Sequence, residues 1–145
     1  MTGSKRAMTL EDVAEIIRHC DAGPDPAAAY AAAAHIARET CGWRLFTVLE
    51  LAASENAVVR LWSSDPAAYP VGGSKPLDKT PAGRAQMRQD GEIFLAGTRE
   101  AVREAFFDYD LIFSLGITAI MNVPVRHLGR TLGMLNFCGE EGMYG

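Results

Sequence analysis

Few side chains in this chain of 145 residues have types and spacings that could perform chemistry. Its histidines, His19, His35 and His127, lie far apart in the sequence. His19-Cys20-Asp21 places three potential metal ligands in a row at the end of an expected helix, but neighbouring helical residues point in different directions, so we predict no metal site. No P-loop, GxGxxG, HExxH, GxSxG or CxxC motif occurs. The sequence therefore commits to no reaction, and we expect neither enzyme activity nor a cofactor.

The cysteines likewise give no indication of enzyme activity. Cys20, Cys41 and Cys138 are odd in number and widely spaced, which argues against a disulfide scaffold. Cys138 ends an apolar stretch, where a small core residue is the more typical reading than a nucleophile. A small thiol-dependent enzyme that uses Cys138 or Asp110 stays as the least favoured alternative.

Composition narrows the function classes further. The length fits one domain, which we place at residues 9–145 after a flexible N-terminus at 1–8. A net charge of −4 without a basic cluster argues against nucleic acid as a partner. No apolar run approaches the roughly 18 to 20 residues of a membrane helix, and no signal peptide is evident. We therefore expect a cytoplasmic protein without a membrane partner.

The stretch from Asp110 to Cys138 should position any site. Residues 117–125 and 131–137 are apolar runs of strand length, separated by a short reversal that contains Gly129. In the first run the odd-numbered residues form an apolar face, whereas the even-numbered ones, including Asn122, form a mixed face. This pattern predicts an antiparallel hairpin.

The rest of the sequence predicts helices and strands that pack around that hairpin. We expect helices at 9–20, from Asp25 to Gly42, at 80–90 and from Thr98 to Gly116, strands at 43–52, 57–64 and 92–96, and a long loop at 65–79. The first and last strands should be neighbours in the middle of one sheet. The second helix is rich in alanine, and its smooth face serves either internal packing or a dimer seam.

Several motifs carry a resemblance to a known family. They are Tyr69-Pro70-Val71-Gly72-Gly73-Ser74-Lys75, Phe106-Phe107-Asp108, Ser114-Leu115-Gly116, Met121-Asn122-Val123-Pro124-Val125, Gly129, Thr131-Leu132-Gly133 and Leu135-Asn136. On these residues the chain resembles a GAF domain over nearly its whole length. It looks most like the small stand-alone bacterial GAF proteins.

The resemblance implies an α+β, profilin-like fold with a central antiparallel sheet of five or six strands and helices on its faces. It also implies a small-ligand pocket and a role in cyclic-nucleotide, tetrapyrrole or metabolite sensing, or in dimerisation. The Asn-Lys-x-Asp-Glu signature of cyclic-nucleotide binders, a bilin-attaching cysteine and the paired cysteines of free-methionine-sulfoxide reductases are not found. We expect the family's C-terminal helix to be absent, because the sequence ends after the last strand.

A pocket should be lined by the mixed face of the sheet and by residues 65–116. There, aromatic side chains would stack on a planar ligand or close over it, a lysine would meet an anion, and polar groups would orient the ligand. The candidate ligand-binding residues are Trp62, Tyr69, Lys75, Phe106, Tyr109, Asp110, Phe113 and Asn122. Instead of binding a ligand, the aromatic residues could simply pack in the core, and Lys75 could be solvated. The Asn122 amide would bond either a ligand or the 65–79 loop.

The sequence therefore predicts a non-catalytic sensory or regulatory module that binds an unidentified small metabolite and forms a homodimer through its N-terminal helices. The alternative is a dimerisation or protein-interaction module whose pocket is filled by side chains.

Overall fold

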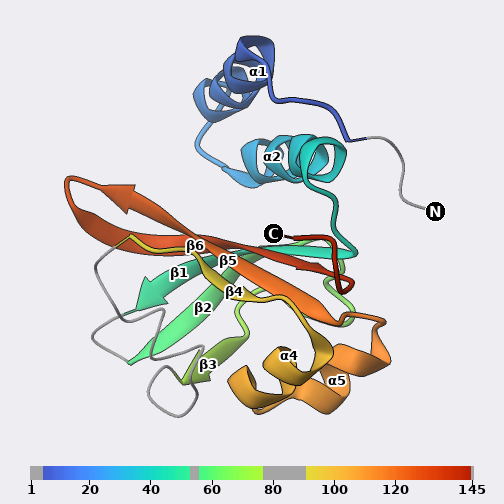
Figure 1. Ribbon diagram of the computed structural model, residues 1–145. Coiled ribbons are helices and arrows are strands. Elements are labelled where there is room, and N and C mark those ends of the chain that lie inside the picture. The colour runs from blue at the N-terminus through green and yellow to red at the C-terminus, as the bar shows by residue number, and fades with distance from the viewer. Residues whose placement is uncertain (1–4, 53–55, 77–90, 145) are drawn as a thin grey trace. The chain divides into compact units, whose positions relative to one another are not determined.

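The computed structural model describes residues 5–52, 56–76 and 91–144 (Figure 1). The chain divides into two compact units, residues 1–43 and residues 44–145, and each is taken by itself below. The prediction of one domain over residues 9–145 stays a prediction. The helix expected at 80–90 lies outside the described residues.

The N-terminal unit contains two helices that pack together, α1 (Leu10–Asp21) and α2 (Ala27–Thr40). The Thr9 hydroxyl accepts a hydrogen bond from the N–H of Asp12, and the Asp12 carboxylate accepts one from the N–H of Thr9. This capping box confirms Thr9 as the N-cap of α1. Before α2, the Asp25 carboxylate accepts a hydrogen bond from the N–H of the first helical residue.

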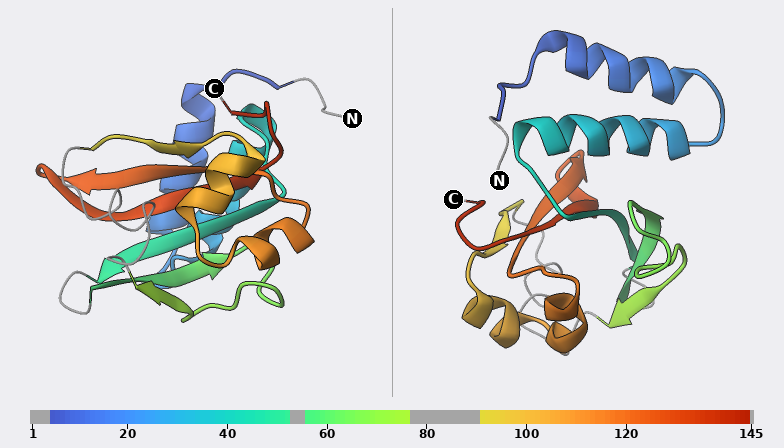
Figure 2. Two further views of the ribbon diagram at one scale, coloured as in Figure 1. Left: turned by 60° about the horizontal axis from the view of Figure 1, so that its bottom comes forward. Right: turned by 90° about the vertical axis from the view of Figure 1, so that its right-hand side faces the viewer.

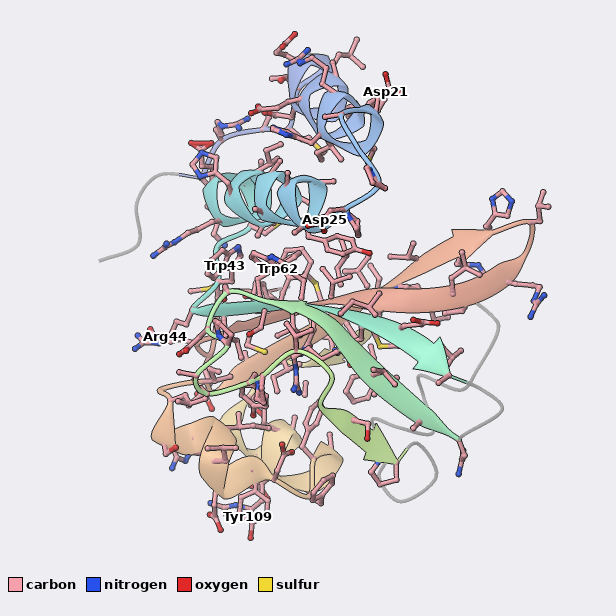
Figure 3. The ribbon with its side chains drawn as sticks, turned by 180° about the vertical axis from the view of Figure 1, so that it is seen from behind. Asp21, Asp25, Trp43, Arg44, Trp62 and Tyr109 are labelled. Atoms are coloured by element: carbon pink, nitrogen blue, oxygen red, sulfur yellow. The ribbon has the colours of Figure 1, made fainter. Side chains whose placement is uncertain are left out.

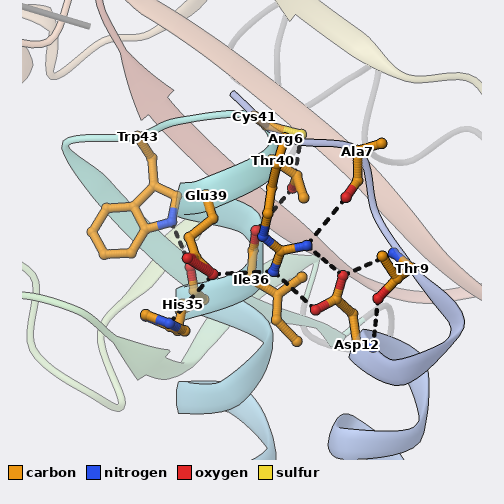
Figure 4. A network of polar contacts seen from close by, with 11 residues as sticks. Arg6, Ala7, Thr9, Asp12, His35, Ile36, Glu39, Thr40, Cys41 and Trp43 are labelled. Atoms are coloured by element: carbon orange, nitrogen blue, oxygen red, sulfur yellow. Dashed lines mark hydrogen bonds and ion pairs between the residues drawn. The ribbon is translucent and has the colours of Figure 1, made fainter. Parts of the chain in front are cut away.

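Arg6 ties the segment before α1 to both helices. Its guanidinium donates to both carboxylate oxygens of Asp12, at 2.7 and 2.9 Å, and to Glu39 of α2 at 3.0 Å (Figure 4). At the end of the unit, the Trp43 indole donates to a carbonyl of α2, and the Arg38 guanidinium lies 4.9 Å from its ring centre. Trp43 therefore belongs to the helical unit, and the strand predicted from residue 43 begins two residues later.

The second unit is built on a six-stranded sheet with the order β3-β2-β1-β6-β5-β4. Its strands are β1 (Leu45–Ala52), β2 (Ala57–Ser63), β3 (Ser74–Pro76), β4 (Phe94–Ala96), β5 (Ala119–His127) and β6 (Arg130–Gly139). All neighbouring strands pair antiparallel. The α+β class and the central pairing of the first and last strands are confirmed. β3 was not predicted, because three residues in a stretch rich in proline and glycine show no alternation.

The hairpin of β5 and β6 closes through the short reversal predicted to contain Gly129, and this reversal is a two-residue turn because the strands extend further than predicted, to His127 and from Arg130. His127 pairs with Arg130, and Leu128 and Gly129 between them have φ values of 51° and 78°. Two consecutive residues with positive φ form the type I′ turn, whose twist matches that of the strands.

The helical stretch expected from Thr98 is two helices, α4 (Arg99–Ala105) and α5 (Tyr109–Ser114). Thr98 caps α4 as predicted, because its hydroxyl accepts a hydrogen bond from the N–H of Ala101. A single helix through residue 109 was wrong, because Phe106 is extended, with φ −125° and ψ 131°. In that conformation its ring packs edge-on against Phe94 of β4, with 6.3 Å between ring centres.

α4 and α5 lie on one face of the sheet (Figure 2). Val102 and Ile112 from these helices pack into one core cluster with Leu45 and Ile120 of the sheet. This is the mixed face predicted for β5, and it carries the candidate site. No described helix is long and apolar enough to cross a membrane.

Candidate functional site

A cavity of about 40 Å³ lies between the sheet and the part of the chain that contains α5 and the residues just before it. Because a water needs roughly 10 to 15 Å³ of such volume, the cavity has room for about three waters or a few non-hydrogen ligand atoms. It is lined by Leu45, Thr47, Leu49, Val58, Arg60, Tyr69, Gly73, Pro76, Phe106, Phe107, Ile112, Ile117, Ile120, Asn122, Asn136 and Cys138. In this conformation it does not fit a nucleotide or a tetrapyrrole.

Arg60 of β2 is the charged residue of this lining, and only 6% of its surface is exposed. Backbone hydrogen bonds of 2.8 Å join Arg60 to Gly72 and to Gly73. Its Nη1 donates to the Pro70 carbonyl at 3.0 Å, and its guanidinium lies 4.7 Å from the ring centre of Tyr69. The segment 69–73 therefore wraps around this side chain and fixes it against the cavity.

A bulge in β2 decides which side chains of that strand face the cavity. Leu49 of β1 pairs with Arg60, whereas the adjacent Val48 pairs with Trp62, so Leu61 is the extra residue. Strict alternation would place Arg60 and Trp62 on one face, but the bulge sends them to opposite faces. Trp62 instead packs against Phe46, with 6.4 Å between ring centres, on the face away from α5 and its Tyr109 (Figure 3).

The electrostatic environment of the cavity follows from burial. Loss of hydration lowers the pKa of Arg60, and the charge of Asp108 partly opposes this shift. Burial likewise raises the pKa of the Tyr69 hydroxyl far above its ordinary value. An arginine stays protonated near neutral pH despite such shifts. The cavity wall therefore carries a positive charge with little water around it.

Two lining groups have unused hydrogen-bonding capacity. The Arg60 Nε and the Thr47 hydroxyl are buried and have no hydrogen-bond partner. Asn122, by contrast, donates its side-chain amide to the Asn136 side chain, which lies directly across from it on β6. The described partner of Asn122 is thus a neighbouring strand. Its predicted bond to the 65–79 loop stays a prediction, because residues 77–79 of that loop lie outside the described residues.

The structure brings only some of the predicted site residues together. Tyr69, Phe106 and Asn122 line the cavity. Trp62 does not, for the reason given above, and the strand position of Lys75 opposite Val58 is described without its side chain. Their contact with a ligand stays a prediction.

The other three predicted residues lie on α5 and outside the cavity lining. Tyr109 and Phe113 contact each other, with 5.8 Å between ring centres, and the Arg99 guanidinium lies 4.0 Å from the centre of the Phe113 ring. Asp110 is exposed to solvent. Tyr109 and Phe113 are partly buried and pack against the core cluster. The predicted ligand contacts of all three residues likewise stay predictions.

Sequence reasoning missed Arg60, Thr47 and Asn136. The usable signal was Arg60, a lone charge inside the apolar strand Ala57–Ser63. A charged residue in such a strand is buried only when a site requires it or when the pairing shifts its face. Thr47 gave no signal, because threonine is common in strands. Among the described residues, no group of three or more His, Cys, Asp or Glu side chains could hold a metal ion.

Several solved structures have a fold similar to that of this chain. The GAF domain of an Acinetobacter phosphoenolpyruvate-protein phosphotransferase superposes with a TM-score of 0.67 at 15% identity, over 91% of this chain and 77% of that one. This chain has the GAF-domain fold. A second GAF domain, that of A. Aeolicus nlh2 in an inactive state, gives a TM-score of 0.66 at 14% identity, over 90% and 78% of the two chains.

The GAF fold also includes an enzyme among the similar structures. Free methionine-R-sulfoxide reductase from Neisseria meningitidis, in complex with its substrate, gives a TM-score of 0.65 at 19% identity, over 97% of this chain and 82% of that one. No protein-family model and no curated protein matches the sequence. At these identities the likeness establishes the GAF fold and leaves function to the site.

Proposed function

We propose that this GAF-fold chain is a sensory or regulatory module that binds a small metabolite and performs no catalysis. One observation carries the proposal: the cavity under α5 combines apolar walls with the buried guanidinium of Arg60 and the unbonded hydroxyl of Thr47. Such a combination is typical of pockets that orient a small ligand through a few polar groups. The GAF domains among the similar structures support the same class of function.

Native and denaturing mass spectrometry of the freshly purified protein test this proposal together. A bound metabolite gives a mass excess in the native spectrum that disappears on denaturation. Thr47→Leu, which puts apolar bulk into the cavity, should abolish the excess. Thr131→Leu changes another buried threonine, one outside the cavity lining, and should retain the excess. An excess that survives in Thr47→Leu contradicts ligand binding in this cavity.

The two residues considered separately for catalysis lie in different places, and a small enzyme that uses either one stays the least favoured alternative. Cys138 lines the cavity and is 3% exposed, whereas Asp110 lies on the solvent-exposed side of α5. The thiol and the carboxylate therefore do not form a common site. A cytoplasmic location remains part of the proposal on the evidence of composition.

The proposal includes a homodimer formed through the N-terminal helices. Leu10, Val13 and Ile17 follow a helical spacing that places them on one side of α1, and their exposed fractions are 88%, 40% and 59%. An apolar stripe in contact with water is the kind of surface that a second copy of the chain would cover. Sedimentation velocity should give a dimer for the wild type and a monomer for Ile17→Glu. A dimer that persists in Ile17→Glu contradicts this interface.

A module for dimerisation alone is the second candidate. The small volume of the cavity, about 40 Å³, favours it, because a pocket filled by its own side chains would look similar. The mass spectra separate the two candidates: a dimer mass without any excess would support dimerisation alone.

A further inference from the structure

Arg60 is a buried cation whose guanidinium forms no ion pair with the part of the chain that the structure describes. Among the described residues, no carboxylate oxygen lies within 4.0 Å of its guanidinium. The hydrogen bond of the guanidinium goes to the neutral Pro70 carbonyl, and Nε is left without a partner. The charge of Asp108 and the Tyr69 ring offset part of the cost of this burial. A ligand that pairs with the guanidinium and with Nε would offset more of it.

The surrounding segment is shaped to hold the guanidinium in one place. A Cβ at Gly73 would lie 2.5 Å from Nη1 of Arg60, so the absence of a side chain at Gly73 makes room for the guanidinium. The Tyr69 ring and the Pro70 carbonyl hold it from other sides. This support leaves Nε without a partner. The guanidinium edge formed by Nε and Nη2 can donate two parallel hydrogen bonds to a carboxylate that is admitted beside it.

We propose that the cavity binds a small monocarboxylate, with Arg60 pairing the carboxylate and the Thr47 hydroxyl donating a further hydrogen bond. The inference rests on the proposed function and names its ligand class. A single guanidinium balances a single negative charge, which favours a carboxylate over a phosphate dianion. Leu49, Val58 and Ile120 provide the apolar wall for a short carbon chain, and the volume limits that chain to two or three carbons.

Acetate is the probe, and isothermal titration calorimetry is the measurement. A ligand of four non-hydrogen atoms binds no tighter than roughly tens of micromolar, so the titration must extend into the millimolar range. Acetate should bind with saturation, whereas the neutral isostere acetamide and matched sodium chloride should not. Equal binding of acetamide or chloride overturns the proposal, because either result removes the requirement for a carboxylate.

Two variants test the role of Arg60, and a third serves as the control. Arg60→Met should weaken acetate binding at least tenfold, and its removal of an unpaired buried charge should leave the fold intact. Gly73→Ala should weaken binding several-fold, because the new methyl group displaces the guanidinium. Arg126→Met removes an arginine that bonds Thr131 and Gly129 outside the cavity lining, and should leave binding unchanged. Unaltered acetate affinity in Arg60→Met overturns the proposal.

Failure of the carboxylate assignment can be told apart from failure of ligand binding in the cavity. The native spectrum could instead show a bound compound that carries no charge. That result, together with no acetate binding, overturns the carboxylate assignment and leaves the sensory module standing. A mass excess that survives in Thr47→Leu, together with no acetate binding, overturns both.

Discussion

β6 approaches the backbone of β1 closely at Gly133. A Cβ at this position would lie 2.0 Å from the Leu49 carbonyl oxygen, and the backbone of two central strands cannot move apart cheaply. We expect Gly133→Ala to lower the free energy of unfolding by about 3 kcal/mol or more, at the upper end for an overpacked core. Gly97→Ala is the matched control, because the nearest atoms to its Cβ lie at ordinary contact distances of 3.8 and 4.0 Å. Urea unfolding of both variants measures the difference, and equal losses would contradict the close approach.

Individual residues also mark where sequence reasoning reached its limit. The even-numbered side chains of β5 could be assigned to the mixed face, because alternation along a regular strand decides which side Asn122 takes. Arg60 and Trp62 could not be assigned in the same way, because the bulge at Leu61 depends on how β2 pairs with β1. A bulge leaves no mark in hydrophobic alternation, so the tryptophan was predicted to face the pocket and the nearby arginine was not.

At the scale of elements, the first helix depends on an ion pair that acid should break. The Arg6 guanidinium, together with the backbone N–H of Thr9, holds the pKa of Asp12 far below its ordinary value of about 3.9. A carboxyl with a lowered pKa in the folded state stabilises that state above its unfolded pKa, and this stabilisation disappears as the pH falls through the folded pKa. The contribution should therefore be complete above about pH 5 and decrease from about pH 4 downward.

Thermal unfolding of the whole chain between pH 6 and pH 2 measures this effect. Asp12→Asn should lower the melting temperature at pH 6, and its difference from the wild type should shrink as the pH approaches 2. Glu11→Gln removes an exposed ion pair with Arg18 on the same helix and should change little at any pH. A difference for Asp12→Asn that stays constant with pH would contradict the ion-pair account.

The turn between β5 and β6 carries a residue poorly suited to its conformation. Leu128 has φ 51° and is 88% exposed, so burial offers little in return for the left-handed backbone. Asparagine adopts this conformation more readily and precedes Gly129 in the favoured Asn-Gly sequence of type I′ turns. Leu128→Asn should raise the free energy of unfolding by about 0.5 to 1 kcal/mol in urea titrations. Leu132→Asn, an exposed leucine within β6, should not stabilise, and equal gains in both would reject the turn explanation.

Across the whole molecule, regular periodicity predicted the elements that dominate the sheet. The central pairing of β1 with β6 and the β5–β6 hairpin followed from long apolar runs and their order. The three-residue strand β3 and the break between α4 and α5 did not, because each depends on partners distant in sequence. β3 exists through its pairing with β2, and the chain leaves the helix at Phe106, whose ring contacts Phe94.

The central claim is that a small carboxylate enters the cavity beside Arg60, and methyl NMR tests it most directly. Acetate would be titrated into protein labelled at the methyl groups of Ile, Leu and Val, with Arg60→Met measured in parallel. We expect saturable shifts at Leu49 and Ile120, which line the cavity, and none at Val48 or Val123, which lie outside its lining. In Arg60→Met these shifts should be lost. Shifts at Val48 and Val123, or unchanged shifts in Arg60→Met, would contradict the claim.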